Sequence, residues 1–445
     1  MNKKILSMLL LSILILILKP LGISINQAVV IISLIWTIMA WVVGKPNKIV
    51  SSLFLLGIFI LFGETPIEKV LSFPLSSNFL VIIFSFVFSQ GIINSKLTEK
   101  LFRPFIAKYA KNVYQFLFTM VITVIILVFI IPQPLSRVIL LSTIYIQYFE
   151  SIDLNCKTRE VLLLCMFEVN IIAHIFFKRG DIVLNNGILD VANIQMTEFE
   201  WTKNLMIPGL AMLTLAMVFF VIAFKSELKL FKSDEKDVKK VKLESNDKIN
   251  LGLILLIIIL WATENIHNIS GSVVVIIGTI LMYLRKIIDF RDFKSINLEV
   301  LVFLTAAFSI GTVMEGSGIA DKIFGGLSRY LPESFSYTFV LVVMLSTMVL
   351  HMALGSSVTT MSVAIPSFIS IAGEGIDPTI IMFLVFTSIV TQYLLPFHNV
   401  LLAVGEGNNY FGNKVVFRYG LYCTVLTFIS VFLFFIPWWK FIGLI

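Results

Sequence analysis

The chain has 445 residues, of which 58% are hydrophobic and only 14% are charged, and its formal net charge is +7. Soluble domains carry charged side chains on about a quarter of their residues, so this composition excludes a soluble globular protein and indicates a polytopic membrane protein. In a soluble chain the basic balance would suggest nucleic acid, but membrane topology explains it here, and we expect no nucleic-acid partner.

Apolar segments of membrane-spanning length recur along the whole chain. There are eleven, at about residues 5–23, 27–44, 50–63, 78–94, 160–177, 204–224, 250–266, 271–284, 297–315, 379–395 and 415–437. The first follows two lysines, as a signal peptide does, but no small-residue cleavage site comes after it. We therefore expect it to remain as the first membrane helix.

Two longer apolar stretches contain residues that break helices. Residues 114–149 are interrupted at Pro132-Gln133-Pro134, and residues 335–373 are interrupted at Gly355. Backbone that leaves the helix at bilayer depth survives only inside protein or facing a wet cavity. Both stretches therefore predict re-entrant hairpins with a binding site at the tip, and close packing of small residues between helices is the alternative.

Lysine and arginine residues are distributed unequally between the two sides of the membrane. With a cytoplasmic N-terminus and eleven crossings, 25 of the 34 fall on inside loops, seven fall outside, and Lys19 and Arg137 lie within the membrane. This positive-inside bias predicts a multi-pass protein of the cytoplasmic membrane with its N-terminus in the cytoplasm. The basic run at 225–249 is interpreted as a cytoplasmic linker rather than as a lipid or nucleic-acid patch.

The two parts of the chain resemble each other at a nearly constant offset, from 218 residues (Phe199 to Phe417) to 222 residues (Phe102 to Phe324). An odd number of crossings separates the copies, so they face opposite ways, as the inverted repeats of secondary transporters do. The predicted units are scaffold helices 1–77, a first repeat 78–224, the linker 225–249, scaffold helices 250–296 and a second repeat 297–445. An amphipathic piece, Lys96–Asn112 or Ile319–Pro332, precedes each hairpin and predicts an interfacial helix.

Three stretches of the second half follow a known pattern. Leu260–Gly278 reads LWATENIHNISGSVVVIIG, the tip at residues 356–360 reads SSVTT with Pro366 after it, and Leu395-Pro396-Phe397-His398-Asn399 precedes a Gly-Glu-Gly at 405–407. The chain resembles the divalent anion:sodium symporter family, the dicarboxylate and sulfate permeases of the ion-transporter superfamily, as a diverged member. The resemblance implies an all-α inverted-repeat transporter fold with eleven membrane helices, two re-entrant hairpins, elevator-like movement and a homodimer.

In that family each hairpin tip supplies carbonyl and hydroxyl groups to a carboxylate substrate and a sodium ion. The substrate-binding residues that we predict are Ser136, Arg137, Ser356, Ser357, Thr359, Thr360, His398 and Asn399. The cation-coupling residues that we predict are Gly355, Ser356, Thr360, Glu168, His174 and Asp181, with a sodium ion near Ser356, Ser357 and Thr360.

The first tip departs from the family pattern. It reads PQPLSR over residues 132–137, without the family's Ser-Asn-Thr, and Lys178-Arg179-Gly180-Asp181 stands in place of Thr-Pro-Pro-Asn. A charge near the bilayer centre is costly and usually functional, so we hypothesise that Arg137 is a fixed cation where relatives bind sodium. Its guanidinium would bind the anion bidentately, through two parallel N–H···O hydrogen bonds. The alternative is that Arg137 snorkels to the cytoplasmic interface.

Other titratable residues lie close to the predicted breaks. Glu168 and His174 share one apolar helix and could carry protons, the alternatives being a Glu168–Arg137 salt bridge and a structural histidine. His351 and His398 flank the second tip and the second break, where packing roles are expected, with His398 retained as a substrate contact. Glu264 and His267 are expected to be interfacial.

These observations predict a secondary active transporter, not an enzyme. The substrates that the resemblance implies are a di- or tricarboxylate or an inorganic oxyanion, and transport would be coupled to sodium, to protons or by exchange. We expect the anion and the lipid bilayer as its partners, and no cofactor apart from sodium as a coupling ion. The alternatives are a transport-inactive family member and a membrane enzyme of cell-surface glycans, although the external loop Lys178–Lys203 offers few catalytic groups.

Overall fold

The computed structural model describes residues 3–43, 46–109, 111–231, 243–319, 322, 334–373 and 375–445. Every regular element within these residues is helical, as predicted. Six helices are long and apolar enough to cross a membrane, and seven shorter apolar helices accompany them. Several of the eleven predicted spans form these shorter helices, because the chain leaves helical geometry before the apolar run ends.

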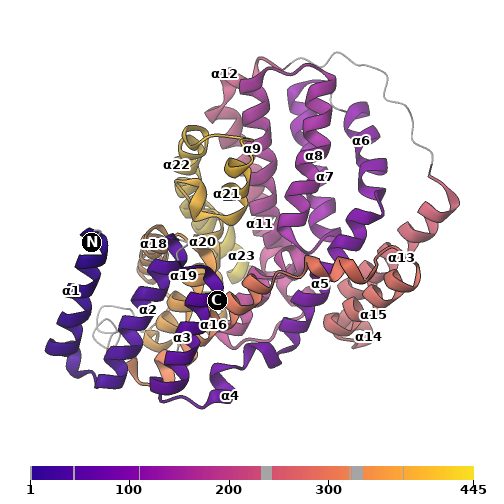
Figure 1. Ribbon diagram of the computed structural model, residues 1–445. Coiled ribbons are helices and arrows are strands. Elements are labelled where there is room, and N and C mark those ends of the chain that lie inside the picture. The colour runs from indigo at the N-terminus through magenta and orange to yellow at the C-terminus, as the bar shows by residue number, and fades with distance from the viewer. Residues whose placement is uncertain are drawn as a thin grey trace.

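The first half consists of short and long helices in the order shown in Figure 1. Its elements are α1 (Lys3–Leu18), α2 (Ile25–Val43), α3 (Lys48–Phe62), α4 (Ile67–Val70), α5 (Ser77–Asn94), α6 (Leu97–Tyr109), α7 (Val113–Ile130), α8 (Pro134–Ser151), α9 (Cys156–Ala173), the 3-10 turns η3 (His174–Phe176) and η4 (Lys178–Asp181), α10 (Leu184–Ala192), α11 (Glu198–Ala223) and α12 (Lys225–Leu228). Side chains of Asn47, Ser76 and Asn112 cap α3, α5 and α7 by accepting hydrogen bonds from backbone amides.

The elements of the second half run from α13 to α23. They are α13 (Ser245–Ala262), α14 (Glu264–His267), α15 (Gly271–Leu284), η5 (Phe290–Ser295), α16 (Leu298–Gly316), α18 (Tyr337–Leu354), α19 (Ser357–Ile371), α20 (Pro378–Val390), η7 (Pro396–His398), α21 (Val400–Gly407), α22 (Asn413–Ser430), the π-helix η8 (Val431–Phe435) and α23 (Ile436–Phe441). The interfacial helix predicted at Lys96–Asn112 forms α6. Apart from Ile319 and Lys322, its predicted counterpart Ile319–Pro332 lies outside the described residues, as does the central part of the linker 225–249.

Both interrupted apolar stretches form a pair of helices joined by a short break. The pair α7–α8 is broken at Ile131–Gln133, where proline removes a backbone donor, and Gln133 caps α8. The pair α18–α19 is broken at Gly355, whose φ of 62° lies in the left-handed region that favours glycine. That these pairs re-enter from one side of the membrane stays a prediction.

Helices α9 and α20 form the centre of the molecule. No residue from Val161 to Ala173 or from Ile380 to Val390 is more than 3% exposed. A helix that is apolar on all sides is stable only when other helices surround it. Both end abruptly, at His174 and at Thr391, and short irregular segments lead to α10 and α21. The breaks in helical structure that follow α9 and α20 therefore lie in the interior of the molecule.

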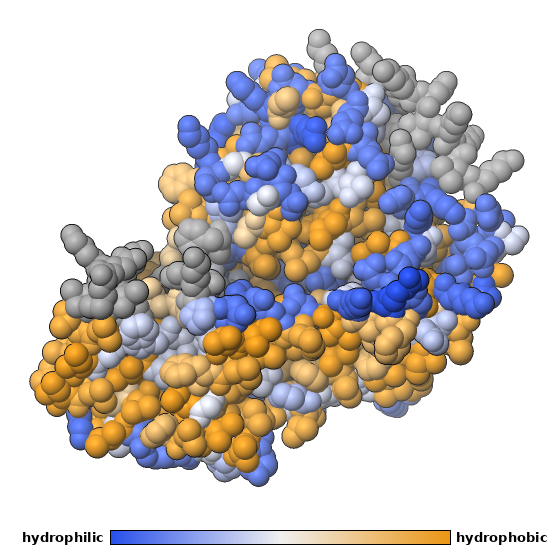
Figure 2. Space-filling model, viewed as in Figure 1, coloured by the Kyte–Doolittle hydropathy of each residue, from blue (hydrophilic) through white to orange (hydrophobic). Residues whose placement is uncertain are grey.

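The exterior carries the apolar surface of a membrane protein. Large apolar side chains such as Leu10, Ile17 and Leu61 are strongly exposed on α1 and α3. Figure 2 shows hydrophobic residues over the lower part of the molecule, where α1–α3 lie in Figure 1, and hydrophilic residues gathered on the upper part. Contiguous apolar surface of this kind marks contact with lipid or protein.

Helix α16 approaches α19 closely where Gly311 meets Pro366. A Cβ added at Gly311 would lie 2.5 Å from Cγ of the rigid Pro366 ring, so Gly311→Ala is expected to lower the free energy of unfolding by about 1–3 kcal/mol. Gly252→Ala in α13 is the matched control, because nothing lies within 4 Å of its added Cβ. Thermal unfolding of the purified variants checks this. Equal midpoints for the two would contradict the close packing.

Candidate functional site

A cavity of about 340 Å³ lies between the breaks of the two helix pairs. Its volume falls within the roughly 300–1,000 Å³ of small-molecule sites. One side is formed by Gln133, Pro134 and Leu135 at the first break, and the other by residues 354–358 at the second. Lys48 of α3 and Glu299 of α16 add a charge of each sign. Sequence reasoning missed both, because they come from helices distant in the chain.

Residues at the starts of α3, α8, α10, α16, α19 and α21 line this cavity, and four of these helices, α8, α10, α19 and α21, follow the two tips and the ends of α9 and α20. The first residues of each line it, and each start is capped by a polar side chain of its own: Gln133 accepts from Ser136 N, Asp181 from Val183 N and Leu184 N, Ser356 from Thr359 N, and Asn399 from Leu401 N. The N-terminus of a helix carries a partial positive charge and unsatisfied N–H groups. Four such ends directed at one space favour a negatively charged occupant.

The structure brings about half of the predicted site residues together. The residues at the cavity are His174, Asp181, Gly355, Ser356, Ser357, His398 and Asn399. The remaining ones, Ser136, Arg137, Glu168, Thr359 and Thr360, are not among the residues that line it. They lie behind the cavity surface, where their partners define what they can do.

Arg137 is completely buried and holds the first break together. Its Nη1 donates to the carbonyl oxygens of Ile131 (2.6 Å) and Gly180 (2.8 Å), and its Nε donates to Oδ1 of Asn170 (3.0 Å). The side chain therefore does not snorkel to the interface. Two of its nitrogens are engaged with protein oxygens, which differs from the predicted bidentate contact with a substrate. Its Nη2 is buried without a partner.

Glu168 lies in α9 against residues of the second half. Its carboxylate accepts a short hydrogen bond from the hydroxyl of Tyr393, and Sγ of Cys423 lies 3.9 Å away. Arg137 bonds to other oxygens, so the alternative of a Glu168–Arg137 salt bridge is not formed. The group joins α9 to the segment after α20 rather than opening into the cavity.

Hydrogen bonds fix the second tip from behind. The backbone N and Oγ1 of Thr360 both donate to the carbonyl of Ser356, at 2.9 and 2.8 Å, and Oγ1 of Thr359 donates to Oγ of Ser356 at 3.1 Å. Nδ1 of His351 lies 3.2 Å from Oγ1 of Thr360. The predicted sodium oxygens of Ser356 and Thr360 are thus already bonded within the protein.

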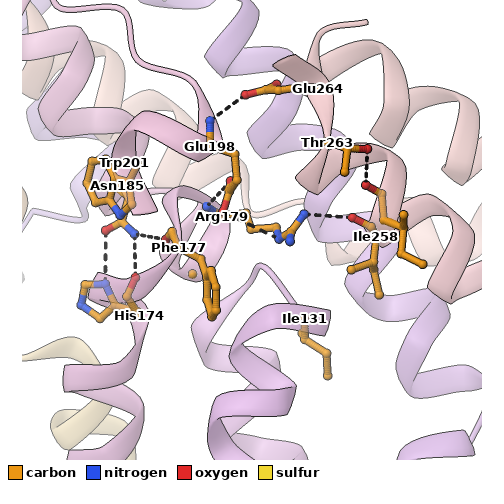
Figure 3. Close-up of polar contacts among 12 residues, drawn as sticks. Ile131, His174, Phe177, Arg179, Asn185, Glu198, Trp201, Ile258, Thr263 and Glu264 are labelled. Carbon is orange, nitrogen blue, oxygen red and sulfur yellow. Dashed lines mark hydrogen bonds and ion pairs between the residues drawn. The ribbon is translucent and has the colours of Figure 1, made fainter. Parts of the chain in front are cut away.

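The histidine after α9 is held by Asn185 of α10, as Figure 3 shows. Nδ2 of Asn185 donates to the carbonyls of His174 and Phe177, both at 2.9 Å, which leaves Oδ1 facing Nδ1 of His174 at 3.2 Å. Nδ1 of His174 therefore carries the hydrogen. The histidine after α20 is held in the opposite way, because Nδ1 of His398 accepts from Leu394 N and Leu395 N.

A second, smaller cavity of about 90 Å³ lies beside Arg179, Glu198 and Glu264. Nη1 of the buried Arg179 donates to the carbonyl of Ile258 in α13 (3.1 Å), and its guanidinium lies 4.1 Å from the Phe129 ring centroid. Nε of Arg179 is 4.0 Å from Oε1 of Glu198.

Glu264 completes this cluster by accepting from the backbone N of Glu198 (Figure 3) and from that of Gly271, both at 2.9 Å. The sequence-based expectation of an interfacial Glu264 did not anticipate these bonds, since Glu198 and Glu264 are 66 residues apart. The cluster connects the segment after α9 to α13, α14 and α15.

Comparison with known proteins agrees with a transport site. Over residues 1–445 the chain matches the model of the family described as "Sodium:sulfate symporter transmembrane region". It is 23% identical over 264 residues to "Putative malate transporter YflS" of Bacillus subtilis (strain 168), covering 55% of this chain and 54% of that protein. The match thus spans about half the length of this curated relative. Since the family match covers the whole chain, the protein belongs to the sodium:sulfate symporter family of multi-pass membrane transporters.

Proposed function

We propose that this protein is a secondary active transporter that binds a small anion in the cavity between the two tips and carries it across the cell membrane. The observation that carries the proposal is the convergence of four helix N-termini on one cavity. The anion is a di- or tricarboxylate or an inorganic oxyanion. The similarity to a protein described as a putative malate transporter favours a dicarboxylate.

The architecture that supports this transport is an inverted repeat of eleven crossings and two re-entrant hairpins, with a cytoplasmic N-terminus and a homodimeric assembly. Support comes from the element order, since α7, α8 and α9 begin 224, 223 and 222 residues before α18, α19 and α20 (337 − 113, 357 − 134, 378 − 156). Broken helices that meet in the interior suit alternating access by an elevator-like movement.

In this proposal the anion is contacted by side chains from the tip between α18 and α19 and from the segment that follows α20. Ser356, Ser357, His398 and Asn399 offer hydroxyl, imidazole and amide groups at the cavity. Arg137 lies behind the first tip as a fixed cation: its guanidinium occupies a site between two carbonyls and an amide oxygen, the kind of oxygens that a sodium ion would take. Asp181, which interacts electrostatically with Arg137, partly offsets that charge.

Thermal stability of the purified protein tests the proposal. Malate, succinate, citrate, sulfate and phosphate are added separately, each with and without sodium. A ligand that binds only the folded state at 100 times its Kd stabilises it by about 2.7 kcal/mol, so one of these anions is expected to raise the midpoint. If none of them does, the proposed substrate class is wrong.

Ser357→Ala is expected to weaken binding of that anion about tenfold. A hydrogen bond to a charged group contributes roughly 1.5–3 kcal/mol, part of which water replaces. Ser370→Ala, at the far end of the same helix and bonded only to the Ser367 carbonyl, is the matched control. Equal affinity of the two variants in a titration would remove Ser357 from the site.

A further inference from the structure

Three of the four histidines in the chain lie close to the cavity: His174 follows α9, His398 follows α20, and His351 lies in α18 four residues before Gly355. His174 and His398 line the cavity, whereas His351 lies behind the second tip in α18 and has no role in anion contact. The exception, His267, is partly exposed, with Nε2 2.7 Å from the Leu260 carbonyl. His351 is buried near the anion cavity, and its hydrogen bonds indicate what it can do there.

Those bonds determine where the hydrogen of His351 lies. The hydroxyl of Thr360 donates to the carbonyl of Ser356 at 2.8 Å, so it has no hydrogen left for the ring. Nδ1 of His351, 3.2 Å from this hydroxyl oxygen, must therefore be the donor. In the neutral ring Nε2 then carries the lone pair, and it is buried without a hydrogen-bond partner.

Oxygen acceptors lie around the ring of His351. Backbone carbonyls of Ser356 and Gln392 face it, and Oε1 of Gln392 is a buried acceptor without a partner. The ring of His398, whose centroid lies 6.3 Å away, is the titratable group that faces His351. Of the helices packed against α18, α2, α19 and α20 contain no titratable side chain, and α23 brings Lys440, whose Nζ lies 3.3 Å from the hydroxyl of Tyr337 at the opposite end of α18.

More distant charges belong to the cavity itself. Asp181 and His174 lie on its first-half side, and Lys48 and Glu299 also line it. No carboxylate of the described residues bonds to His351, so an imidazolium there needs a counter-charge from elsewhere. An anion in the cavity supplies that charge.

We propose that Nε2 of His351 is the binding site for the coupling proton, which it takes up together with the anion. This rests on the proposed function. The proton comes from water, forms an N–H bond with the Nε2 lone pair and returns to water when the anion leaves on the other side. Of the tip oxygens predicted to bind sodium, the Ser356 carbonyl and the Thr360 hydroxyl already accept hydrogen bonds, from Thr360 and from His351 respectively.

The test uses purified protein in liposomes with radiolabelled malate. His351→Asn keeps a side-chain N–H for Thr360 and removes the titratable group, and His267→Asn is the matched control at the partly exposed histidine. A pH gradient, acid outside, is expected to drive malate accumulation in the wild type and in the control. His351→Asn is expected to retain malate exchange within about twofold and to lose accumulation at least about tenfold, because exchange needs no net proton release.

A second measurement counts protons directly. Malate binding is followed by calorimetry in buffers of different ionisation enthalpy, and roughly one proton is expected to bind with each malate in the wild type and none in His351→Asn. Malate binding without proton uptake in the wild type overturns the proton role even if no variant folds. So does accumulation that follows a sodium gradient and is unchanged in His351→Asn. Absence of binding by every anion in the stability panel overturns the proposed function and this role with it.

Discussion

Replacing Arg137 with alanine is expected to lower the free energy of unfolding by about 3–5 kcal/mol and to abolish anion binding. The change leaves the carbonyls of Ile131 and Gly180 and the amide oxygen of Asn170 buried without their donor. Removing one partner of a buried charged network has a cost of this size. Because these oxygens belong to the break after α7, to α9 and to η4, whereas Arg137 itself lies in α8, the first break is expected to lose its shape.

The Arg137 variant is compared with Arg291→Ala, whose parent side chain is 86% exposed and pairs only with Asp289. The exposed variant is expected to change stability by less than about 1 kcal/mol. Millimolar guanidinium, which can donate to the same three oxygens, should restore part of the stability of Arg137→Ala, and choline should not. An unfolding midpoint equal to that of the wild type would contradict the assigned network.

Replacing Arg179 with alanine is the second large effect, expected to lower the free energy of unfolding by about 3–5 kcal/mol. Glu198 would remain buried, with the guanidinium at 4.0 Å gone and the Ile258 carbonyl without its donor. The double variant Arg179→Met with Glu198→Gln removes both charges and keeps most of the volume. It is expected to recover at least about half of the loss, because a neutral buried pair avoids the uncompensated charge.

A double-mutant cycle from chemical unfolding measures this coupling between Arg179 and Glu198. Glu200→Gln is the matched control, since Glu200 is exposed in the same helix turn and bonds only to Thr197. A double variant that is less stable than Arg179→Ala alone would show that the two side chains do not compensate each other. The charge cluster of Figure 3 would then have another role.

Several features of this protein could be predicted from the sequence because they depend on local chemistry. Apolar composition predicts a helical membrane protein, since only helices and barrels satisfy the backbone in lipid. Pro132 and Pro134 remove backbone donors, and Gly355 permits a left-handed turn, so the breaks in both helix pairs appear where the sequence places them. The residues at the second tip and break, Ser356 and Asn399 among them, likewise reach the cavity.

The partners of the charged and titratable residues were decided only by the tertiary structure. Glu168 and Tyr393 are separated by 225 residues in the chain, and Arg137 and Gly180 by 43. A buried polar group must find a partner wherever packing brings one within hydrogen-bond distance, and sequence spacing does not encode that distance. For this reason the sequence pointed to Arg137 as unusual but not to the three oxygens that hold it, and it predicted only a packing role for His351, whose bond to Thr360 is visible only in the structure.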